Sequence, residues 1–200
     1  KDDIQTDGSI KVKEEIIFKD KTNSHLRKLL PPKSEQKLYD AINYAIFSGG
    51  KRFRAFLVIQ AAKLFEIPVV RALQAASAIE IIHTYSLVHD DLPSMDNDDF
   101  RRGKPTIHIK WDEATAVLVG DALQAFAYQI LSFEETHPKS EVRLNLIRTL
   151  SEASGLKGMV LGQSKDLEAE KNNKSLELKD IINLQKLKTL QTLNKLKNLS

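Results

Sequence analysis

Hydrophobic residues recur along this chain with the spacing of α-helices. Residues 70–89 (VRALQAASAIEIIHTYSLVH) are apolar on nearly every side, which is typical of a helix in the centre of a bundle. Residues 38–46 carry a narrower stripe, with apolar side chains at every third or fourth position. No stretch of useful length alternates with the period of two that marks a strand. The sequence therefore predicts an all-α fold, an antiparallel bundle of long helices.

Glycines and prolines divide this pattern into segments. The predicted helices are residues 34–47 with Ser34 as N-cap, 52–65, 70–89, 112–131, 139–153, 155–170 and 175–198. Residues 1–20 are polar and contain the breakers Gly8 and Ser9, so we expect a poorly anchored N-terminal segment. Residues 21–189 are predicted to form one helical domain. Residues 190–200, dominated by Leu, Lys and Asn, are expected to form a divergent terminus.

The composition excludes several classes of protein. The chain is 42% hydrophobic and 28% charged, as in ordinary soluble proteins. We expect no membrane-spanning helix and, without a signal-peptide pattern at the start, a cytoplasmic location. A net charge of +3 is too small to indicate nucleic-acid binding. The sequence has no cysteine, which excludes disulfides and thiolate metal sites, so a metal here must be hard and oxygen-liganded.

An acidic cluster follows the apolar segment 70–89. Residues 90–102 read DDLPSMDNDDFRR, with five aspartates in ten positions and then two arginines. Clustered carboxylates repel one another, and the C-terminal end of a helix already carries negative potential. A divalent cation relieves both effects, so we predict a Mg²⁺ site in which Asp90 and Asp96 reach one ion. Asp98 and Asp99 are expected to pair with the arginines. A solvated polar loop is the alternative interpretation.

Three further groups carry candidate chemistry. Gly49–Arg54 (GGKRFR) places basic residues at a predicted helix start, where free N–H groups favour anions. His83 lies seven residues before the first aspartate of the cluster, on the same helical face. Gln163 and Asp166 lie three apart on a predicted helix, and Asp121 interrupts an apolar stripe, so all three could face one cavity. The structural alternatives are a basic surface, a satisfied core histidine and an ordinary buried polar network.

Five segments occur in order between residues 49 and 189: GGKRFRA, IHTYSLVHDDLPSMDNDDFRRGKPT, GDALQ, GMVLGQSKDLEAE and KLKT, within a match that covers about residues 29–189. Together they resemble the motifs of the trans-polyprenyl diphosphate synthases, and most of all those of the bacterial farnesyl diphosphate synthases. The resemblance implies an isoprenoid-synthase bundle that forms a homodimer. It also implies Mg²⁺-dependent condensation of isopentenyl diphosphate with an allylic diphosphate, dimethylallyl or geranyl, to farnesyl diphosphate in isoprenoid biosynthesis.

The resemblance also implies roles for individual residues. Mg²⁺ on the allylic diphosphate would be bound by Asp90 and Asp96, with Asp91 in support. Isopentenyl diphosphate would be held by Lys51, Arg54, His83 and Arg102. The allylic diphosphate would be contacted by Arg101, Lys188 and Thr189, with Gln163 and Asp166 near the metals. The implied catalytic set is Asp90, Asp91, Asp96, Arg101 and Lys188. Tyr85 would block the growing chain at farnesyl length, although a tyrosine packed in the core is the alternative.

The sequence departs from the family pattern at three positions and lacks one motif. Ala55 stands where proline is usual, Leu161 replaces a glycine, and Leu190 replaces a small residue. The family's second Asp-rich motif would lie beyond residue 200, so we expect a C-terminally truncated polypeptide that is a weak or dead catalyst. Two alternatives stay open. One is a non-catalytic bundle that retains Mg²⁺ and diphosphate binding or partners a full-length synthase, and the other is a plain structural domain.

Overall fold

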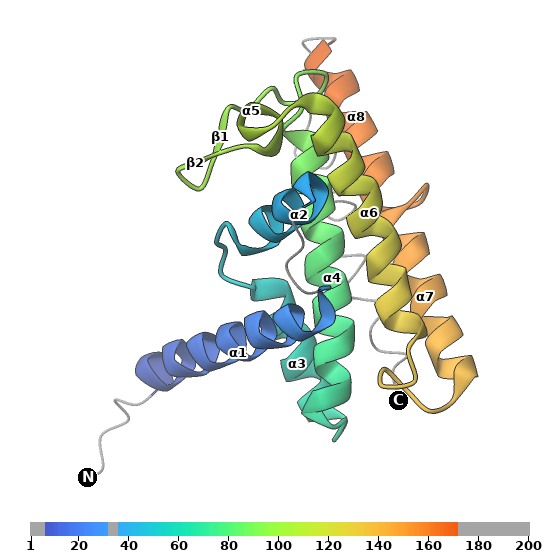
Figure 1. Ribbon diagram of the computed structural model, residues 1–200. Coiled ribbons are helices and arrows are strands. Elements are labelled where there is room, and N and C mark those ends of the chain that lie inside the picture. The colour runs from blue at the N-terminus through green and yellow to red at the C-terminus, as the bar shows by residue number, and fades with distance from the viewer. Residues whose placement is uncertain (1–6, 32–35, 172–200) are drawn as a thin grey trace.

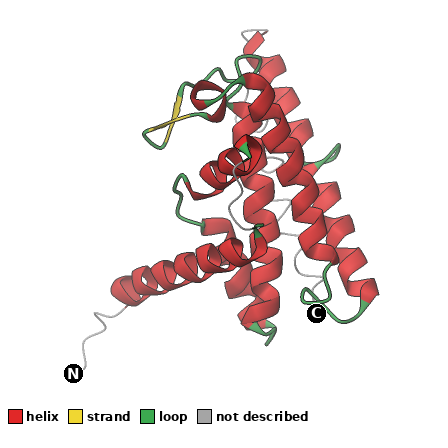
Figure 2. Cartoon of the chain, viewed as in Figure 1, coloured by secondary structure: helices red, strands yellow, loops and turns green. Residues whose placement is uncertain are grey.

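The structure, a computed structural model, describes the backbone of residues 7–31 and 36–171 (Figure 1). Within these ranges it contains the following elements: α1 (Asp7–Leu29), α2 (Lys37–Phe47), α3 (Phe53–Leu64), α4 (Val69–Asp90), β1 (Phe100–Arg101), β2 (Lys104–Pro105), α5 (Ile107–Lys110), α6 (Glu113–Ser132), α7 (Ser140–Ser154) and α8 (Met159–Lys171). Most of the described residues are helical, and the β1–β2 hairpin contains the only strands in the described ranges (Figure 2). The predicted all-α bundle is confirmed.

Helix α4 is the central element of the bundle. Most of its residues are buried, because it packs against α6 along one side and against α3 and α1 along another (Figure 1). Ala76 and Ala78 are fully buried, and their small side chains let the neighbouring helices approach closely. The C-terminal end of α4 lies at the same end of the molecule as the β1–β2 hairpin and α5 (Figure 1). This end therefore collects the acidic cluster and the residues that follow it.

Helix α6 is the second long apolar helix. Asp112 caps its start by accepting a hydrogen bond from the backbone N–H of Thr115 at 2.7 Å, as a typical N-cap does. By length and composition alone, α6 is apolar enough to cross a membrane, which the sequence analysis did not expect. In the structure its inner face packs on α4, and an apolar helix in the core of a bundle passes the same test.

Several boundaries differ from the sequence-based expectation. α2 begins at Lys37 with Gln36 as its N-cap, while the predicted N-cap Ser34 lies outside the described residues. α1 runs through residue 20 without a break, and Phe18 is buried against Phe56, with ring centroids 6.1 Å apart. This contact anchors α1 at Phe18, and the expectation for residues 1–20 as a whole stays a prediction. The predicted helix 175–198 lies outside the described residues.

Candidate functional site

A cavity of about 840 Å³ opens beside the C-terminal half of α4. Its lining residues come from α3, α4, the loop after α4, α6 and α8, and many of them are apolar. Four polar residues expected at the site line it: Arg54 from α3, His83 and Asp90 from α4, and Gln163 from α8. Tyr85 lines it as well. The structure thus brings together, around one apolar space, residues that lie more than a hundred positions apart in the sequence.

The Asp-rich loop folds back onto the end of α4. The backbone N–H of Asp96 donates to the carbonyl of Asp90 at 2.8 Å, so the two predicted metal ligands share one turn of chain. The Asp96 carboxylate also lies 3.4 Å from the amide nitrogen of Gln163 on α8. Asp90 is half-buried at the cavity and Asp96 is exposed. Asp90 and Gln163 therefore line the cavity, and Asp96 lies beside it, next to Gln163.

Asp91 is held differently from its neighbour Asp90. Its side chain is buried, and one carboxylate oxygen accepts from Arg101 Nε at 2.7 Å and lies 2.5 Å from Arg101 Nη2. Burial raises the pKa of Asp91, and the bonds from Arg101 oppose that shift. Arg101 also pairs with Asp98 at 3.3 Å, which confirms the expected pairing of Asp98 with an arginine. In this structure Asp91 anchors Arg101, and roles of either residue toward metal or substrate stay predictions.

The turn between β1 and β2 places the side chain of Arg102 next to Gly49 and Gly50. Arg102 and Gly103 both have positive φ, which is the geometry of a two-residue hairpin turn. Arg102 donates to the carbonyl of Gly49, and a Cβ on Gly50 would lie 2.5 Å from its guanidinium. Glycine is favoured at position 50 because its φ of 115° lies in a region that L side chains rarely adopt, and a Cβ there would also displace the Arg102 guanidinium. Lys51, predicted to share this site, is exposed.

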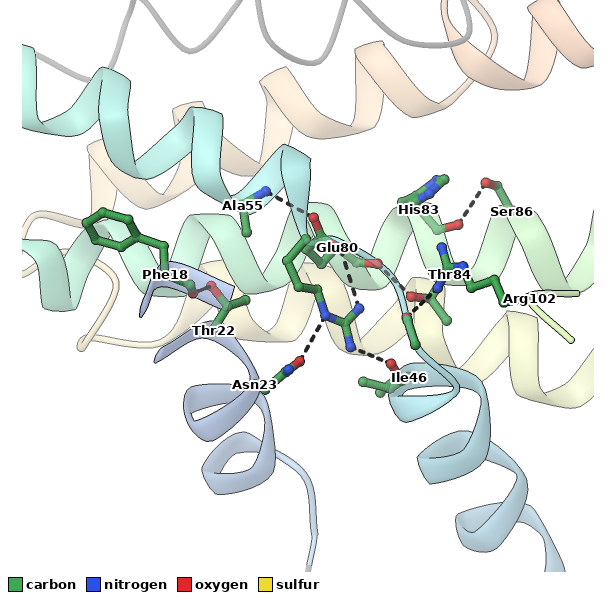
Figure 3. Close-up of polar contacts among 12 residues, drawn as sticks. Phe18, Thr22, Asn23, Ile46, Ala55, Glu80, His83, Thr84, Ser86 and Arg102 are labelled. Carbon is green, nitrogen blue, oxygen red and sulfur yellow. Dashed lines mark hydrogen bonds and ion pairs between the residues drawn. The ribbon is translucent and has the colours of Figure 1, made fainter. Parts of the chain in front are cut away.

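Positive charges surround His83. Burial, together with the charges of Arg54 and Arg102, lowers the pKa of His83 to about 3, so its imidazole is neutral at pH 7. Figure 3 shows His83 and Arg102 on the same side of the network around Glu80. Several cations that face one half-buried ring form a site that an anion would stabilise. This arrangement suits a diphosphate group.

The depressed pKa of His83 predicts a pH-dependent stability. Between about pH 3 and pH 6.5 the unfolded chain binds a proton at this residue that the folded chain does not. The free energy of unfolding should therefore fall as the pH drops below 6.5, by at most about 1.4 kcal/mol per pH unit. Urea unfolding at pH 7.0, 6.5 and 5.5 measures this slope. His83→Asn should flatten it, whereas the control His137→Asn, in the α6–α7 connection, should leave it unchanged. Equal slopes in the parent chain and His83→Asn would contradict the prediction.

The oxygen donors at the cavity suit Mg²⁺ only in part. Among the described residues, no group of three or more His, Asp or Glu side chains could hold a metal ion by itself. Mg²⁺ commonly takes one or two carboxylates and completes its shell with water and substrate phosphates. Asp90 and Asp96 match that requirement. The donor set therefore fits Mg²⁺ together with a phosphate ligand.

The remaining predicted residues are distributed as follows. Lys188 and Thr189 lie outside the described residues, as does Leu190. Asp166 is half-buried on α8 and Asp121 is exposed on α6, and neither lines the cavity. Of the three described residues that could face one cavity, only Gln163 lines it.

Sequence reasoning gave no role to Glu80 or Met159. Met159 lines the cavity from α8. Glu80 is buried, and it accepts a hydrogen bond from the backbone N–H of Ala55, which the proline usual at that position could not donate. A signal was available in the sequence, since Glu80 is the one carboxylate within the apolar segment 70–89.

This chain is similar to known proteins in both sequence and fold. A sequence model of the family described as "Polyprenyl synthetase" matches residues 35–196. The farnesyl diphosphate synthase of Haemophilus influenzae is 48% identical over 149 residues, 74% of this chain and 50% of the relative. That of Buchnera aphidicola is 45% identical over 156 residues, 78% of this chain and 55% of the relative. The chain spans about half the length of the curated relatives it matches.

Solved structures agree with the sequence comparison. An FPP/GFPP synthase from Zymomonas mobilis, in an apo structure, matches with a TM-score of 0.87 at 45% identity, over 96% of this chain and 69% of that one. A geranyltransferase from Legionella pneumophila matches with a TM-score of 0.87 at 36% identity, over 96% and 68% of the two chains. The helical bundle, the motifs around its cavity and these matches agree, and the chain belongs to the polyprenyl synthetase family.

Proposed function

We propose that this chain carries the diphosphate-binding cavity of a Mg²⁺-dependent prenyltransferase of isoprenoid biosynthesis. The reaction would condense isopentenyl diphosphate with dimethylallyl or geranyl diphosphate to make farnesyl diphosphate. One observation carries the proposal: Arg54, His83, Asp90 and Gln163 converge on one largely apolar cavity. Cations and carboxylates in that space match a substrate with a charged head and a hydrocarbon tail.

Isopentenyl diphosphate would bind at the cationic side of the cavity. Arg54 and Arg102, whose charges act on His83, would hold the diphosphate. Lys51, exposed at the adjoining loop, would add a third donor. A bound dianion would also favour protonation of His83, because it reverses the local charge that lowers the pKa of this residue.

The allylic diphosphate would bind at the acidic side. Asp90 and Asp96 would hold Mg²⁺, which when bound neutralises charge on the leaving diphosphate. Arg101, Lys188 and Thr189 would contact the same diphosphate, with Gln163 beside the metal ligands. The allylic C1–O bond breaks and releases diphosphate. C4 of isopentenyl diphosphate then bonds to C1, and a proton passes from the isopentenyl C2 to the released diphosphate.

The apolar lining would protect the carbocation from water. Ile79, Ile82 and Leu92 face the cavity, so the isopentenyl double bond is the nucleophile at hand. Losing one well-placed electrostatic partner of such a reaction costs about 3 kcal/mol in the barrier.

Tyr85 is the proposed limit on product length. It is buried, lines the cavity, and lies five residues before Asp90, roughly 7.5 Å further along α4. Tyr85→Ala should open space for a longer tail, so the affinity for geranylgeranyl diphosphate should rise relative to farnesyl diphosphate. Calorimetric titration of both ligands into the parent chain and the variant measures this ratio, with Tyr128→Phe as the control. An unchanged ratio would leave Tyr85 as an ordinary core residue.

The proposal is tested by incubating the chain with Mg²⁺, isopentenyl diphosphate and geranyl diphosphate. Farnesyl diphosphate as product supports the prenyltransferase, and an ordinary enzyme rate would contradict the expectation of a weak catalyst. Mg²⁺-dependent binding without product supports the alternative, a bundle that retains binding and partners a full-length synthase. If the chain neither binds the ligands nor forms product, the prenyltransferase and the binding-only alternative are both overturned.

A homodimer in the cytoplasm is the proposed setting. Helix α6 exposes Leu118 and helix α7 exposes Leu144. Burying such apolar side chains against another chain would be favourable. A second copy of this chain is the partner that we propose for this surface.

A further inference from the structure

Glu80 lies buried in the middle of α4 and uses both oxygens of its carboxylate. Oε1 accepts from the backbone N–H of Ala55 at 3.0 Å, and Oε2 lies 3.4 Å from Nη1 of Arg52 (Figure 3). Both partners belong to the start of α3. Glu80 also lies three residues before His83, so the two side chains occupy neighbouring positions on one face of α4. A single carboxylate therefore connects the start of α3 to the helix that carries His83 and Asp90.

The start of α3 lacks a cap of its own. Its N-cap, Arg52, has φ of 54° in the left-handed region, and its side chain makes no capping hydrogen bond. The first N–H groups of a helix need an acceptor, and the positive end of the helix dipole favours a carboxylate. Glu80 supplies that acceptor from another helix. The position of the first turn of α3 thus depends on α4.

Arg52 extends the same network to two further helices. Its Nε donates to Asn23 on α1 at 2.9 Å, and its Nη2 donates to the carbonyl of Ile46 near the end of α2. The side chain is buried, and Glu80 is the one carboxylate with which it pairs in the described part of the chain. Four helices therefore meet at this one ion pair.

Arg54 is the residue that this network orients toward the cavity. It lies in the first turn of α3, between Arg52 and Ala55, and it lines the cavity beside His83. Burial and the charge of Arg102 lower the pKa of Arg54, while the charge of Glu80 raises it. Without Glu80, the first turn of α3 would be uncapped and the cations around His83 would repel one another.

We propose that Glu80 is a positioning residue for the isopentenyl diphosphate subsite, holding Arg54 in register with His83 through Arg52 and the Ala55 N–H. This inference rests on the proposed function. In this role Glu80 does not contact the substrate. The role differs from general stabilisation because it concerns the cationic side of the cavity and leaves the acidic side, at Asp90 and Asp96, unaffected.

Glu80→Gln tests the proposal, because glutamine has one acceptor oxygen where the carboxylate has two. The variant can satisfy either Arg52 or the Ala55 N–H, and its amide group then faces the other donor. We expect the affinity for isopentenyl diphosphate, measured by calorimetry, to fall about tenfold. The Mg²⁺-dependent affinity for geranyl diphosphate should change less than about twofold, since its proposed ligands lie two or more turns away along α4. General destabilisation would lower both affinities alike.

A second variant covers the case in which Glu80→Gln fails to fold. The double variant Arg52→Met with Glu80→Leu removes both buried charges, and such replacements are often neutral for stability. We expect it to regain the thermal midpoint of the parent chain and still to bind isopentenyl diphosphate weakly. Glu14→Gln is the matched control, because it removes an exposed α1–α3 ion pair, with Lys63 at 3.8 Å, and should change neither affinity.

The outcomes separate this inference from the proposed function. Suppose that the parent chain binds both ligands. Equal losses of affinity for the two ligands in Glu80→Gln would then overturn the positioning role alone. Parent-level affinity for isopentenyl diphosphate in the double variant would do the same. A parent chain that binds neither ligand would overturn the proposed function, and the positioning role with it. A selective loss of isopentenyl diphosphate in both variants would support the inference.

Discussion

Replacing Asp90 by alanine is expected to weaken Mg²⁺-dependent binding of geranyl diphosphate by about a hundred-fold or more. Asp90 lines the cavity at the end of α4, and the backbone of Asp96 is tied to it at 2.8 Å. Removing it leaves one carboxylate of the proposed pair. Even the loss of a group that only supports a metal ligand lowers metal affinity about 10- to 100-fold. Titration of geranyl diphosphate at fixed Mg²⁺ measures the effect.

Asp99→Ala is the matched control for this experiment. Asp99 belongs to the same acidic run, is exposed and does not line the cavity, so its removal lowers the local negative charge by the same amount. The affinity of this variant should stay within about threefold of the parent value, as expected for a solvent-screened charge. Comparable losses in the two variants would mean that the acidic run acts through its summed charge, and a defined Asp90 ligand would be contradicted.

Gly158→Ala is expected to detach α8 from the bundle. A Cβ at position 158 would lie 1.7 Å from the backbone oxygen of Ala153 and 2.4 Å from its carbonyl carbon. Backbone atoms of α7 cannot rotate away as a side chain can, so the start of α8 must shift. Overpacking of this kind costs about 3 kcal/mol. Because α8 carries Gln163 and Met159, one wall of the cavity should be lost with it.

Hydrogen exchange of the backbone amides measures this local opening. Amides of α8 should exchange about a hundred-fold faster in Gly158→Ala, while amides in the middle of α4 should keep their protection. Gly103→Ala is the control, because a Cβ there meets nothing within 4 Å and any effect should stay in the hairpin. Unchanged exchange in α8 would show that the α7–α8 turn has room for the methyl group.

Much of the fold follows from hydrophobic spacing. The segment 70–89 is apolar on all sides, and α4 occupies the buried centre at nearly those bounds. The hairpin could not be predicted this way, because strands of two residues have no period to detect. Its turn depends instead on positive φ at Arg102 and Gly103. The burial of Phe18 in α1 could not be predicted for a related reason, because its partner Phe56 is brought to it only by the tertiary fold.

The residues of the candidate site also differ in how far helical spacing predicts them. Residues on a regular helix, such as His83 and Asp90, could be placed on one face by counting, and both line the cavity. Contacts made by residues beyond the helix end could not be counted in this way, so the pairing of Asp91 with Arg101 was not predicted. The role of Glu80 was not predicted, because it depends on contacts with Arg52 and Ala55 at the start of a different helix.

Calorimetric titration of a non-reactive thio-analogue of geranyl diphosphate into the 200-residue chain, with and without Mg²⁺, tests the proposed metal-bound diphosphate site most directly. We expect one binding event per chain that requires Mg²⁺ and is lost in Asp90→Ala. Binding of equal strength without Mg²⁺, or no binding with it, would contradict the claim that the aspartates at the end of α4 hold a metal-bound diphosphate.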